Sequence, residues 1–298
     1  MPELPEVETT VKGLRRYVVN KTIKNVWTDL NTNDKRKHDT VANPKYFSLF
    51  KKSIEGKKII SVERVAKNIL LNLNSGEIIL IHMKLTGHLL YGKYSYSKKN
   101  NKWLPPTHGP LADSFNKYIH VVFSFSQKEH LAFSDMRKFG KITLLDTNGA
   151  HDSKHLKDIG RDPLDKTYTW QEFKSNLNKK SNRKIKTVLM DQTVIAGIGN
   201  IYSDEILWRI GIHPERIVKT IKGSEIKKVF KTMRILLSKG IDLGGDSMSD
   251  YRNISGEKGT FQLHHEAYGR KGEKCHKKNC NGIIERKMIN GRSAHFCN

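Results

Sequence analysis

The sequence predicts an α+β protein with an N-terminal helix and β-sandwich, a helical domain and a C-terminal antiparallel hairpin. The evidence is an apolar stripe at helical spacing near the N-terminus, a series of short β-rich runs between residues 59 and 145, and helical patterns between residues 170 and 239. A change of texture near residue 150 and a cysteine-containing tail divide the chain into domains at 1–150, 151–260 and 261–298.

The first helix is expected from Pro5 to about Val19. Its apolar residues, at successive spacings of four, three and four, share one helical face: Val7, Val11, Leu14 and Val18. Proline is favoured in the first turn of a helix, and the carboxylates of Glu6 and Glu8 would interact favourably with the helix dipole there.

The β-rich runs follow this helix and are separated by Gly, Asn and Ser. They are Ile59–Val65, Asn68–Leu73, Glu77–Leu85, Tyr118–Phe125, Leu131–Phe133 and Lys141–Leu145. Many short strands after one helix favour a β-sandwich or barrel. The segment Gly92–Asn116 is basic and contains three prolines, so it is expected to be a long surface loop, and Asp242–Gly259 is rich in turn residues.

The charge balance points to a polyanionic partner. The 298 residues contain 54 Lys and Arg against 30 Asp and Glu, a net charge of +24, and binding of phosphates would release counterions. A generally basic soluble protein is the alternative that charge alone leaves open. No apolar run reaches about 18 residues, so no membrane contact is expected. Three cysteines, all in the tail, are too few for a secreted disulfide framework and favour an intracellular, reducing compartment.

The N-terminus offers a candidate nucleophile. Methionine before proline is normally removed, which would leave Pro2 with a free secondary amine. An α-amino group has a pKa of about 7.7–8.0, so part of it is neutral and nucleophilic at physiological pH. Glu3 and Glu6 lie close in sequence, one as an acid/base and the other as a positioning group. The alternative is an ordinary acidic helix start with a proline in its first turn.

Two further turns are candidate contacts for a polyanion. Gly197 and Gly199 precede a helical stretch with Asn200 as its expected N-cap, and such a turn presents backbone N–H groups to a phosphate. A simple capped helix would show the same pattern. The turn 135–140 carries Arg137 and Phe139, which could enter a duplex as wedges. The alternative is a hairpin turn with solvated charges and a packed aromatic ring.

The tail contains a partial metal-binding pattern. Cys275 and Cys280 are followed by Cys297, whereas a structural zinc site takes four ligands, typically in two short pairs. The last pair is incomplete, so we expect no cofactor and a tail that folds without zinc. Three cysteines completed by His276 or His295 are the alternative.

The same tail predicts a hairpin. Asn290-Gly291 is a strong turn signal, and apolar residues flank it: Ile283, Ile284, Met288, Ile289 and Phe296. Arg292 would then lie at the tip, either as a phosphate ligand or as a solvated cation.

Several separate segments share a pattern with one known family. They are Pro2–Glu8, Ala66-Lys67 before Ile69–Leu71, Ile81-His82, Met190–Gln192 with Gly197–Glu205, and Tyr268–Glu273. Together they resemble the formamidopyrimidine-DNA glycosylase / endonuclease VIII family over the whole length of the chain. The motifs occur in the right order, which makes the resemblance specific.

The resemblance implies a base excision repair enzyme that is both a DNA glycosylase and an abasic-site lyase. Pro2 would attack C1′ of the damaged nucleotide and form a Schiff base, Glu3 would be the general acid, and Glu6 would support it. Lys67 would complete the catalytic set by contacting phosphates near the lesion. Strand cleavage would proceed by β,δ-elimination. A non-catalytic protein that binds damaged or abasic DNA is the alternative.

Other positions are implied contacts with damaged double-stranded DNA, bound by a monomer. The DNA ligands would be Asn200, Arg292, Lys186 and Arg270. The target base must leave the stack, because its C1′ is unreachable inside the duplex. The void would be filled by Leu85, Arg137 and Phe139.

The sequence also departs from the family pattern. Leu85 stands where a void-filling Met is usual, and Met136-Arg137-Lys138 replaces Pro-Arg-Arg. The first cysteine pair is widened and a fourth cysteine is missing, which places the chain nearest the endonuclease VIII-like members with a metal-free finger. Oxidised pyrimidines are therefore expected to be favoured. The loop Gly244–Gly259 has the length seen in the 8-oxoguanine-active branch, which points instead to purine lesions.

Overall fold

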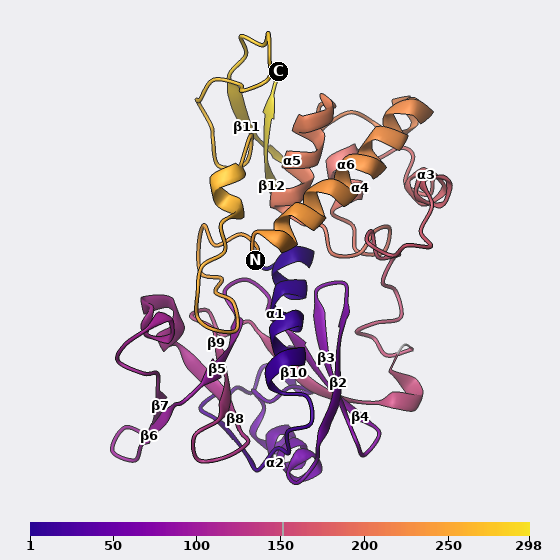
Figure 1. The fold of residues 1–298 in the computed structure, drawn as a ribbon. Coiled ribbons are helices and arrows are strands. Elements are labelled where there is room, and N and C mark those ends of the chain that lie inside the picture. The colour runs from indigo at the N-terminus through magenta and orange to yellow at the C-terminus, as the bar shows by residue number, and fades with distance from the viewer. Residues whose placement is uncertain (151) are drawn as a thin grey trace. The chain divides into compact units, whose positions relative to one another are not determined.

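In the computed structural model, which describes residues 1–150 and 152–298, the chain forms two compact units (Figure 1). The first consists of Met1–Lys157 and Gly244–Thr260, and the second of Asp158–Leu243 and Phe261–Asn298. Gly244–Thr260 is therefore a loop of the first unit that lies, in sequence, between two segments of the second. The three domains predicted from the sequence stay a prediction.

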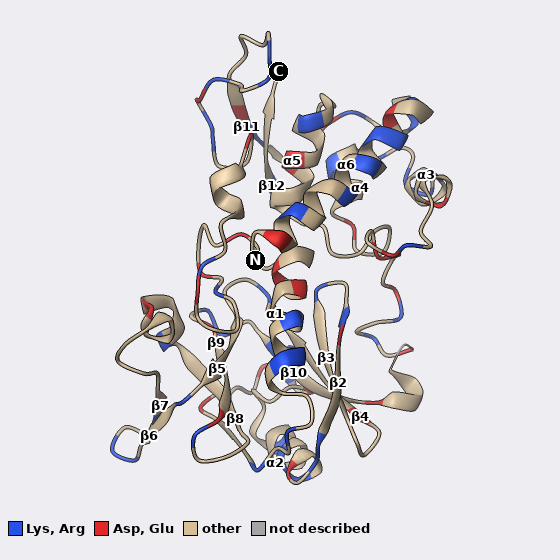
Figure 2. Cartoon of the chain, viewed as in Figure 1, with Lys and Arg blue, Asp and Glu red and all other residues tan. Residues whose placement is uncertain are grey.

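Helix α1 (Leu4–Tyr17) begins at a capping box formed by Glu3 and Glu6. The basic residues Arg15 and Arg16 lie in its last turn, so charge changes sign along the helix in the sense that the helix dipole favours (Figure 2). The predicted helix is present, with each end within two residues of the expected position.

Two four-stranded antiparallel sheets make up most of the first unit, in the orders β1-β8-β9-β5 and β10-β4-β3-β2. The first sheet contains β1 (Asn25–Thr28), β5 (His88–Gly92), β8 (Ile119–Ser124) and β9 (His130–Ser134). The second contains β2 (Ile59–Val65), β3 (Asn68–Leu73), β4 (Glu77–His82) and β10 (Lys141–Asp146). Apolar residues of both sheets, of α1 and of α2 (Pro44–Ile54) form one core, so the predicted β-sandwich is confirmed.

The segment Gly92–Asn116, predicted as a long surface loop, contains regular structure that the prediction missed. This segment contains a small hairpin, β6 (Ser95–Ser97) paired with β7 (Lys102–Leu104), and the short 3-10 helices Pro110–Ala112 and Ser114–Lys117. The aromatic side chains of Tyr96 and Trp103 face each other across the hairpin, which compensates for its short strands.

The second unit contains four helices and a hairpin among its described residues. The helices are α3 (Trp170–Asn178), α4 (Ile185–Leu189), α5 (Asn200–Ile210) and α6 (Gly223–Asp242). Strands β11 (Ile284–Ile289) and β12 (Arg292–Cys297) pair in register around Asn290 and Gly291, both with positive φ. The predicted Asn-Gly hairpin is confirmed. Further short 3-10 helices lie at Lys35–Lys37 and Thr147–Gly149 in the first unit, and at Val218–Thr220 and Phe261–His264 in the second.

One close approach in this unit gives a stability test. A Cβ added at Gly240 in α6 would lie 2.3 Å from the hydroxyl of buried Tyr202, whose ring stacks on Phe261. Alanine is the better helix former by about 1 kcal/mol, but overpacking of this kind costs about 1–3 kcal/mol. We expect Gly240→Ala to lower the free energy of unfolding by about 1–2 kcal/mol in chemical denaturation.

Gly223, at the start of the same helix, is the matched control. A Cβ there would meet only the flexible end of Lys174 at 3.6 Å. Gly223→Ala should be neutral or stabilising by about 0.5 kcal/mol. Equal effects of the two substitutions would contradict the close packing of α6 on Tyr202.

Candidate functional site

Two carboxylates are buried beside Pro2 at the start of α1. Glu6 is 1% exposed, and Pro2 and Glu3 are also buried. The Glu3 N–H donates to Glu6 Oε2 at 2.7 Å, and the N–H of Asp246 donates to Glu6 Oε1 at 2.7 Å. The Glu6 carboxylate thus joins the first helical turn to the loop Gly244–Thr260 of the same unit.

This environment shifts the protonation of Glu6 into the physiological range. Burial, together with the nearby charge of Glu3, raises the pKa of Glu6 from 4.5 to about 7, although the backbone N–H groups of Asp246 and Glu3 oppose the shift. A carboxyl group with this pKa can hold or release a proton near neutral pH.

The loop is fastened to α1 at two more points. The hydroxyl of Tyr251 donates to the carbonyl oxygen of Glu6 at 2.9 Å and lies 3.2 Å from the hydroxyl of Thr10. Gly245 has a φ of +86°, and a Cβ there would lie 2.9 Å from Cγ of Glu6. Only glycine combines this backbone conformation with such a close approach, so the loop requires glycine at this position.

Lys67 lies in the tight turn between β2 and β3, directly after Ala66, which has a positive φ of 56°. Arg64 braces this turn: its Nε donates to Glu8 on α1 at 2.6 Å. Burial and the charges of Lys84 and Lys67 lower the pKa of His82, on the neighbouring strand, to about 3. His82 is therefore neutral, and the local charge is that of the lysines.

The three predicted void-filling residues lie on two turns that are bonded to each other. Leu85 is half-buried in the turn between β4 and β5, next to Thr86, whose hydroxyl donates to Asp135. The second turn, between β9 and β10, holds Arg137 and Phe139 exposed, with the guanidinium 4.7 Å from the ring centroid. The N–H of Arg137 also donates to Thr86 Oγ1 at 3.2 Å, so the structure holds the two turns in fixed relation.

Two predicted DNA ligands are neighbours in the second unit. Asn200 Nδ2 donates to Ser293 Oγ at 3.1 Å, and Ser293 follows the exposed Arg292. The Oδ1 atom of Asn200 is buried and has no hydrogen-bond partner within the described part of the chain. The expected N-cap is wrong by one residue, because Gly199 is the N-cap and Asn200 begins the helix.

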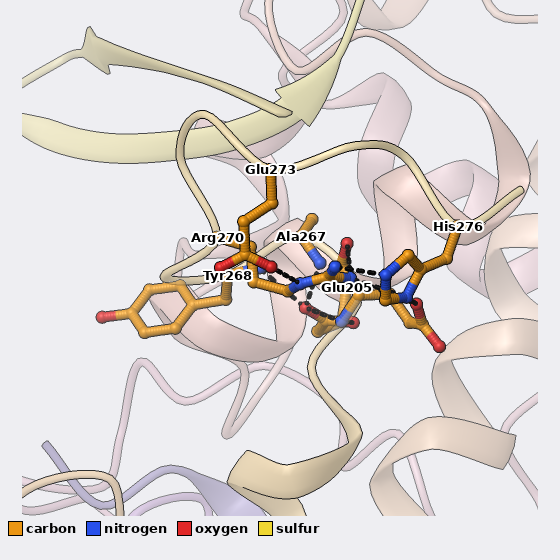
Figure 3. Close-up of polar contacts among 7 residues, drawn as sticks. Glu205, Ala267, Tyr268, Arg270, Glu273 and His276 are labelled. Atoms are coloured by element: carbon orange, nitrogen blue, oxygen red, sulfur yellow. Dashed lines mark hydrogen bonds and ion pairs between the residues drawn. The ribbon is translucent and has the colours of Figure 1, made fainter. Parts of the chain in front are cut away.

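Lys186 and Arg270 have partners inside the same unit. Lys186 is 1% exposed and its ammonium donates to Asp204, which also accepts the N–H of His295 at 2.9 Å. Arg270 Nε donates to Glu273 at 2.7 Å, and its Nη1 lies 2.9 Å from His276 (Figure 3). Both cations are therefore engaged by side chains of the second unit, and their role as DNA ligands stays a prediction.

Beside Asp204, Glu205 holds the start of the tail. Its carboxylate accepts the backbone N–H groups of Glu266, Ala267 and Tyr268 at distances of 2.8–3.1 Å (Figure 3). Burial raises the pKa of Glu205, and the three N–H groups act in the opposite direction. No role for Glu205 follows from the sequence pattern alone.

The three cysteines converge. The Sγ atoms of Cys275, Cys280 and Cys297 lie within 4.8 Å of one another, and those of Cys280 and Cys297 are 3.6 Å apart. Among the described residues, no fourth metal-ligating side chain joins this group. The donor set is one ligand short of a structural zinc site, and Cys275 packs with Ala267 and Ile284 in a small apolar cluster.

Comparison with known proteins decides the family. The profile of the formamidopyrimidine-DNA glycosylase N-terminal domain matches residues 1–142, and that of the formamidopyrimidine-DNA glycosylase H2TH domain matches residues 159–252. The chain belongs to the formamidopyrimidine-DNA glycosylase family. It is 35% identical to the formamidopyrimidine-DNA glycosylase of Pelotomaculum thermopropionicum, over 100% of this chain and 98% of the relative. It is 32% identical to that of Enterococcus faecalis, over 100% and 96% of the two chains.

Solved structures of other members of this glycosylase family agree. The Lactococcus lactis Fpg in complex with DNA containing an abasic site aligns with a TM-score of 0.82 and 29% identity, over 99% of this chain and 97% of that chain. A variant of the same protein with DNA containing Fapy-dG aligns equally well, over 99% and 98%. In the described residues of this family member, no helix is long and apolar enough to cross a membrane.

The raised pKa of Glu6 predicts a pH dependence of stability. The folded state binds a proton on Glu6 up to about pH 7, whereas the unfolded chain loses it near 4.5, so the contribution of Glu6 to stability falls as pH rises between these values. Glu6→Gln cannot titrate. We expect the free energy of unfolding of the wild type, measured relative to Glu6→Gln, to decrease from pH 4.5 to pH 7.

Glu55→Gln on α2 is the control, because Glu55 makes only a partly exposed pair with Lys51. The difference between wild type and Glu55→Gln should change little over this range. A flat difference for Glu6→Gln would show that the pKa of Glu6 is not raised in the folded protein.

Proposed function

We propose that this chain is a bifunctional DNA glycosylase and abasic-site lyase that uses the amine of Pro2 as its nucleophile. The observation that carries the proposal is the position of Pro2, one residue before the buried Glu3 and next to the Glu6 carboxylate at the start of α1. A free amine requires removal of Met1, which is exposed. Membership in the glycosylase family supports the same chemistry at this site.

The proposed reaction begins with the amine of Pro2 and uses the carboxyl group of Glu3. The neutral nitrogen of Pro2 bonds to C1′ of the damaged nucleotide, and the base leaves with the electron pair of the glycosidic bond and a proton. Glu3 delivers a proton to the sugar ring oxygen, so the ring opens and an iminium forms between nitrogen and C1′. Loss of a C2′ proton then expels the 3′ phosphate, and a second elimination expels the 5′ phosphate. Water releases the sugar remnant and restores the amine.

Glu6 supports the reaction without forming or breaking a bond to the substrate. Its two oxygens are occupied by the N–H groups of Glu3 and Asp246, so it fixes the backbone that presents Pro2 and Glu3. Its pKa near 7 keeps part of it neutral, which limits repulsion between two adjacent carboxylates.

DNA would be held by the remaining predicted residues. The relatives in solved complexes bind DNA with an abasic site or with Fapy-dG, and we extend this partner to the present chain. Lys67 and Arg292 supply cations, and Asn200 supplies a polar contact at the start of α5. Leu85, Arg137 and Phe139 would occupy the space left by the flipped base, because wedges need apolar or planar side chains.

The names of the relatives favour formamidopyrimidine lesions as the substrate to test first. Oxidised pyrimidines, the class expected from the sequence, are the comparison, and the placement near endonuclease VIII-like members stays a prediction with them. Excision rates on matched duplexes carrying one lesion of each class decide between the two.

Covalent trapping tests the nucleophile. Borohydride reduces a Schiff base to a stable protein–DNA adduct, so abasic duplex should be trapped efficiently by the wild type. Pro2→Gly, or a tag that blocks the N-terminus, should greatly weaken trapping. Lys12→Gln, which changes an exposed residue on the same helix, should leave it unchanged. Full trapping by the Pro2→Gly and blocked proteins would refute the assignment and favour another amine.

Glu3→Gln separates the two activities. Base removal should slow by about 10²-fold or more, since a positioned general acid contributes about 10²–10⁴, while cleavage of a pre-formed abasic site should be less affected. A protein that binds abasic DNA tightly but neither traps nor cuts it would instead be the non-catalytic binder.

We further propose that the tail folds without zinc. The three thiols pack with apolar neighbours, and the Asn-Gly hairpin has its own core of Ile289, Ala294 and Phe296. Protein purified without added metal should contain well under one zinc per chain by elemental analysis, and prolonged chelation should leave its activity intact. Stoichiometric zinc whose removal abolishes activity would overturn this proposal, because a structural metal contributes folding energy directly.

A further inference from the structure

The first unit contains an aromatic pocket that the reaction does not use. Its volume is about 770 Å³, within the range of ligand sites, and it lies between the β6–β7 hairpin and the sheet that contains β1 and β8. Its walls include Tyr94, Tyr96 and Trp103 from the hairpin segment, His130 from β9 and Lys24 before β1. Figure 1 shows β6 and β7 far from the N-terminus, at another edge of this unit.

The pocket offers flat, uncharged faces. The ring centroids of Tyr96 and Trp103 are 5.5 Å apart, and those of Trp103 and His130 are 4.7 Å apart. Tyr96 remains 40% exposed, although aromatic side chains usually bury most of their surface. Burial lowers the pKa of His130, so its ring is neutral at physiological pH. Exposed aromatic faces of this kind are stacking surfaces for planar ligands.

Two hydrogen-bond donors in the wall are unused. The hydroxyl of Tyr94 and the indole N–H of Trp103 are buried, and neither has a hydrogen-bond partner in the described residues. Buried donors are normally paired, because leaving one unpaired costs stability. Because both atoms are shielded from solvent, they would gain an acceptor only if these side chains turn when a ligand with carbonyl oxygens or ring nitrogens enters.

The chain segment that contributes Tyr94, Tyr96 and Trp103 to the pocket is cationic. Residues 93–112 contain four lysines and no Asp or Glu: Lys93, Lys98, Lys99 and Lys102. Lys24 adds a further cation from the opposite wall. None of these five lysines takes part in an ion pair within the described chain. The positive charge of this segment and of Lys24 therefore suits an anion placed next to a planar group.

We propose that this pocket binds an unpaired nucleotide of single-stranded DNA. The base stacks on Tyr96 and Trp103, and the flanking phosphates contact the hairpin lysines. A duplex does not fit this description, because the faces of its bases are stacked on one another and unavailable. The site is a second DNA contact, separate from the residues around Pro2.

The test uses the full-length protein with its reaction site occupied. A saturating unlabelled duplex that contains a tetrahydrofuran abasic analogue is added first, and binding of a labelled oligothymidylate of eight nucleotides is then followed by fluorescence anisotropy. We expect the oligonucleotide to bind in the presence of the duplex and to quench tryptophan fluorescence. Its affinity should fall steeply with salt.

Matched variants assign the site. Tyr96→Ala should weaken oligothymidylate binding about tenfold, which is within the range for loss of one base–aromatic stack. Leu104→Ala removes an equally exposed apolar side chain, 44% exposed, from the same hairpin but outside the pocket and should have no effect. Lys98→Gln with Lys99→Gln should weaken binding more than Lys45→Gln with Lys52→Gln, the same charge change on α2. Unchanged thermal midpoints show that the variants fold.

Three results would overturn the proposal: no oligothymidylate binding once the duplex is saturating, equal effects of Tyr96→Ala and Leu104→Ala, or thymidine monophosphate binding as tightly as the oligonucleotide. The last would identify a site for free nucleotides. Excision from a lesion-containing duplex should be unchanged in Tyr96→Ala, so failure of this proposal leaves the role of Pro2 untouched.

Discussion

The arrangement of the first unit depends on one buried carboxylate, that of Glu6. Each of its oxygens accepts a backbone N–H, one from Glu3 at the start of α1 and one from Asp246 in a loop 240 residues away. Burying a carboxylate is costly unless it is hydrogen-bonded, and the raised pKa of Glu6 records that cost. The interaction fixes the backbone on which Pro2 and Glu3 are presented.

The second unit contains the same type of interaction, a buried carboxylate that accepts backbone N–H groups. Asp204 and Glu205 are consecutive on the buried helix α5, and both accept backbone N–H groups from the tail, Asp204 from His295 and Glu205 from residues 266–268. These bonds attach the hairpin that carries Arg292 to the helix that begins at Asn200. In both units, therefore, a buried acid on a helix accepts backbone N–H groups from a segment that is distant in the sequence and fixes that segment to the helix. Breaking such a bond would leave a buried charge uncompensated, which destabilises more than loss of a surface pair.

Local patterns in the sequence were sufficient to predict much of the fold. The apolar spacing of α1, the runs of β2 and β3 and the Asn290-Gly291 turn are local signals, and the elements occur where they were expected. The hairpin β6–β7 was missed because its strands are short and polar, and its stability comes from contact between Tyr96 and Trp103 across the turn. Such cross-strand contacts have no periodic signature in a single sequence.

The candidate site was only partly predictable for a related reason. Pro2, Glu3 and Lys67 stand out by residue type and motif, whereas the supporting contacts of Asp246 and Tyr251 come from a loop with no motif. The resemblance implied Lys186 as a DNA ligand, yet it lies in a buried pair with Asp204. Helix α5 is buried almost all round, so hydrophobic periodicity could not separate a buried Asp204 from an exposed one.

The most direct test of the role of Pro2 is the site of covalent attachment. The adduct trapped with borohydride on abasic DNA should be digested with nuclease and protease, and the modified peptide sequenced by mass spectrometry. The account predicts a peptide that begins at Pro2, lacks Met1 and carries the sugar remnant on its α-nitrogen. Attachment to Lys67 or to any other lysine, or an adduct on a chain that retains Met1, would contradict it.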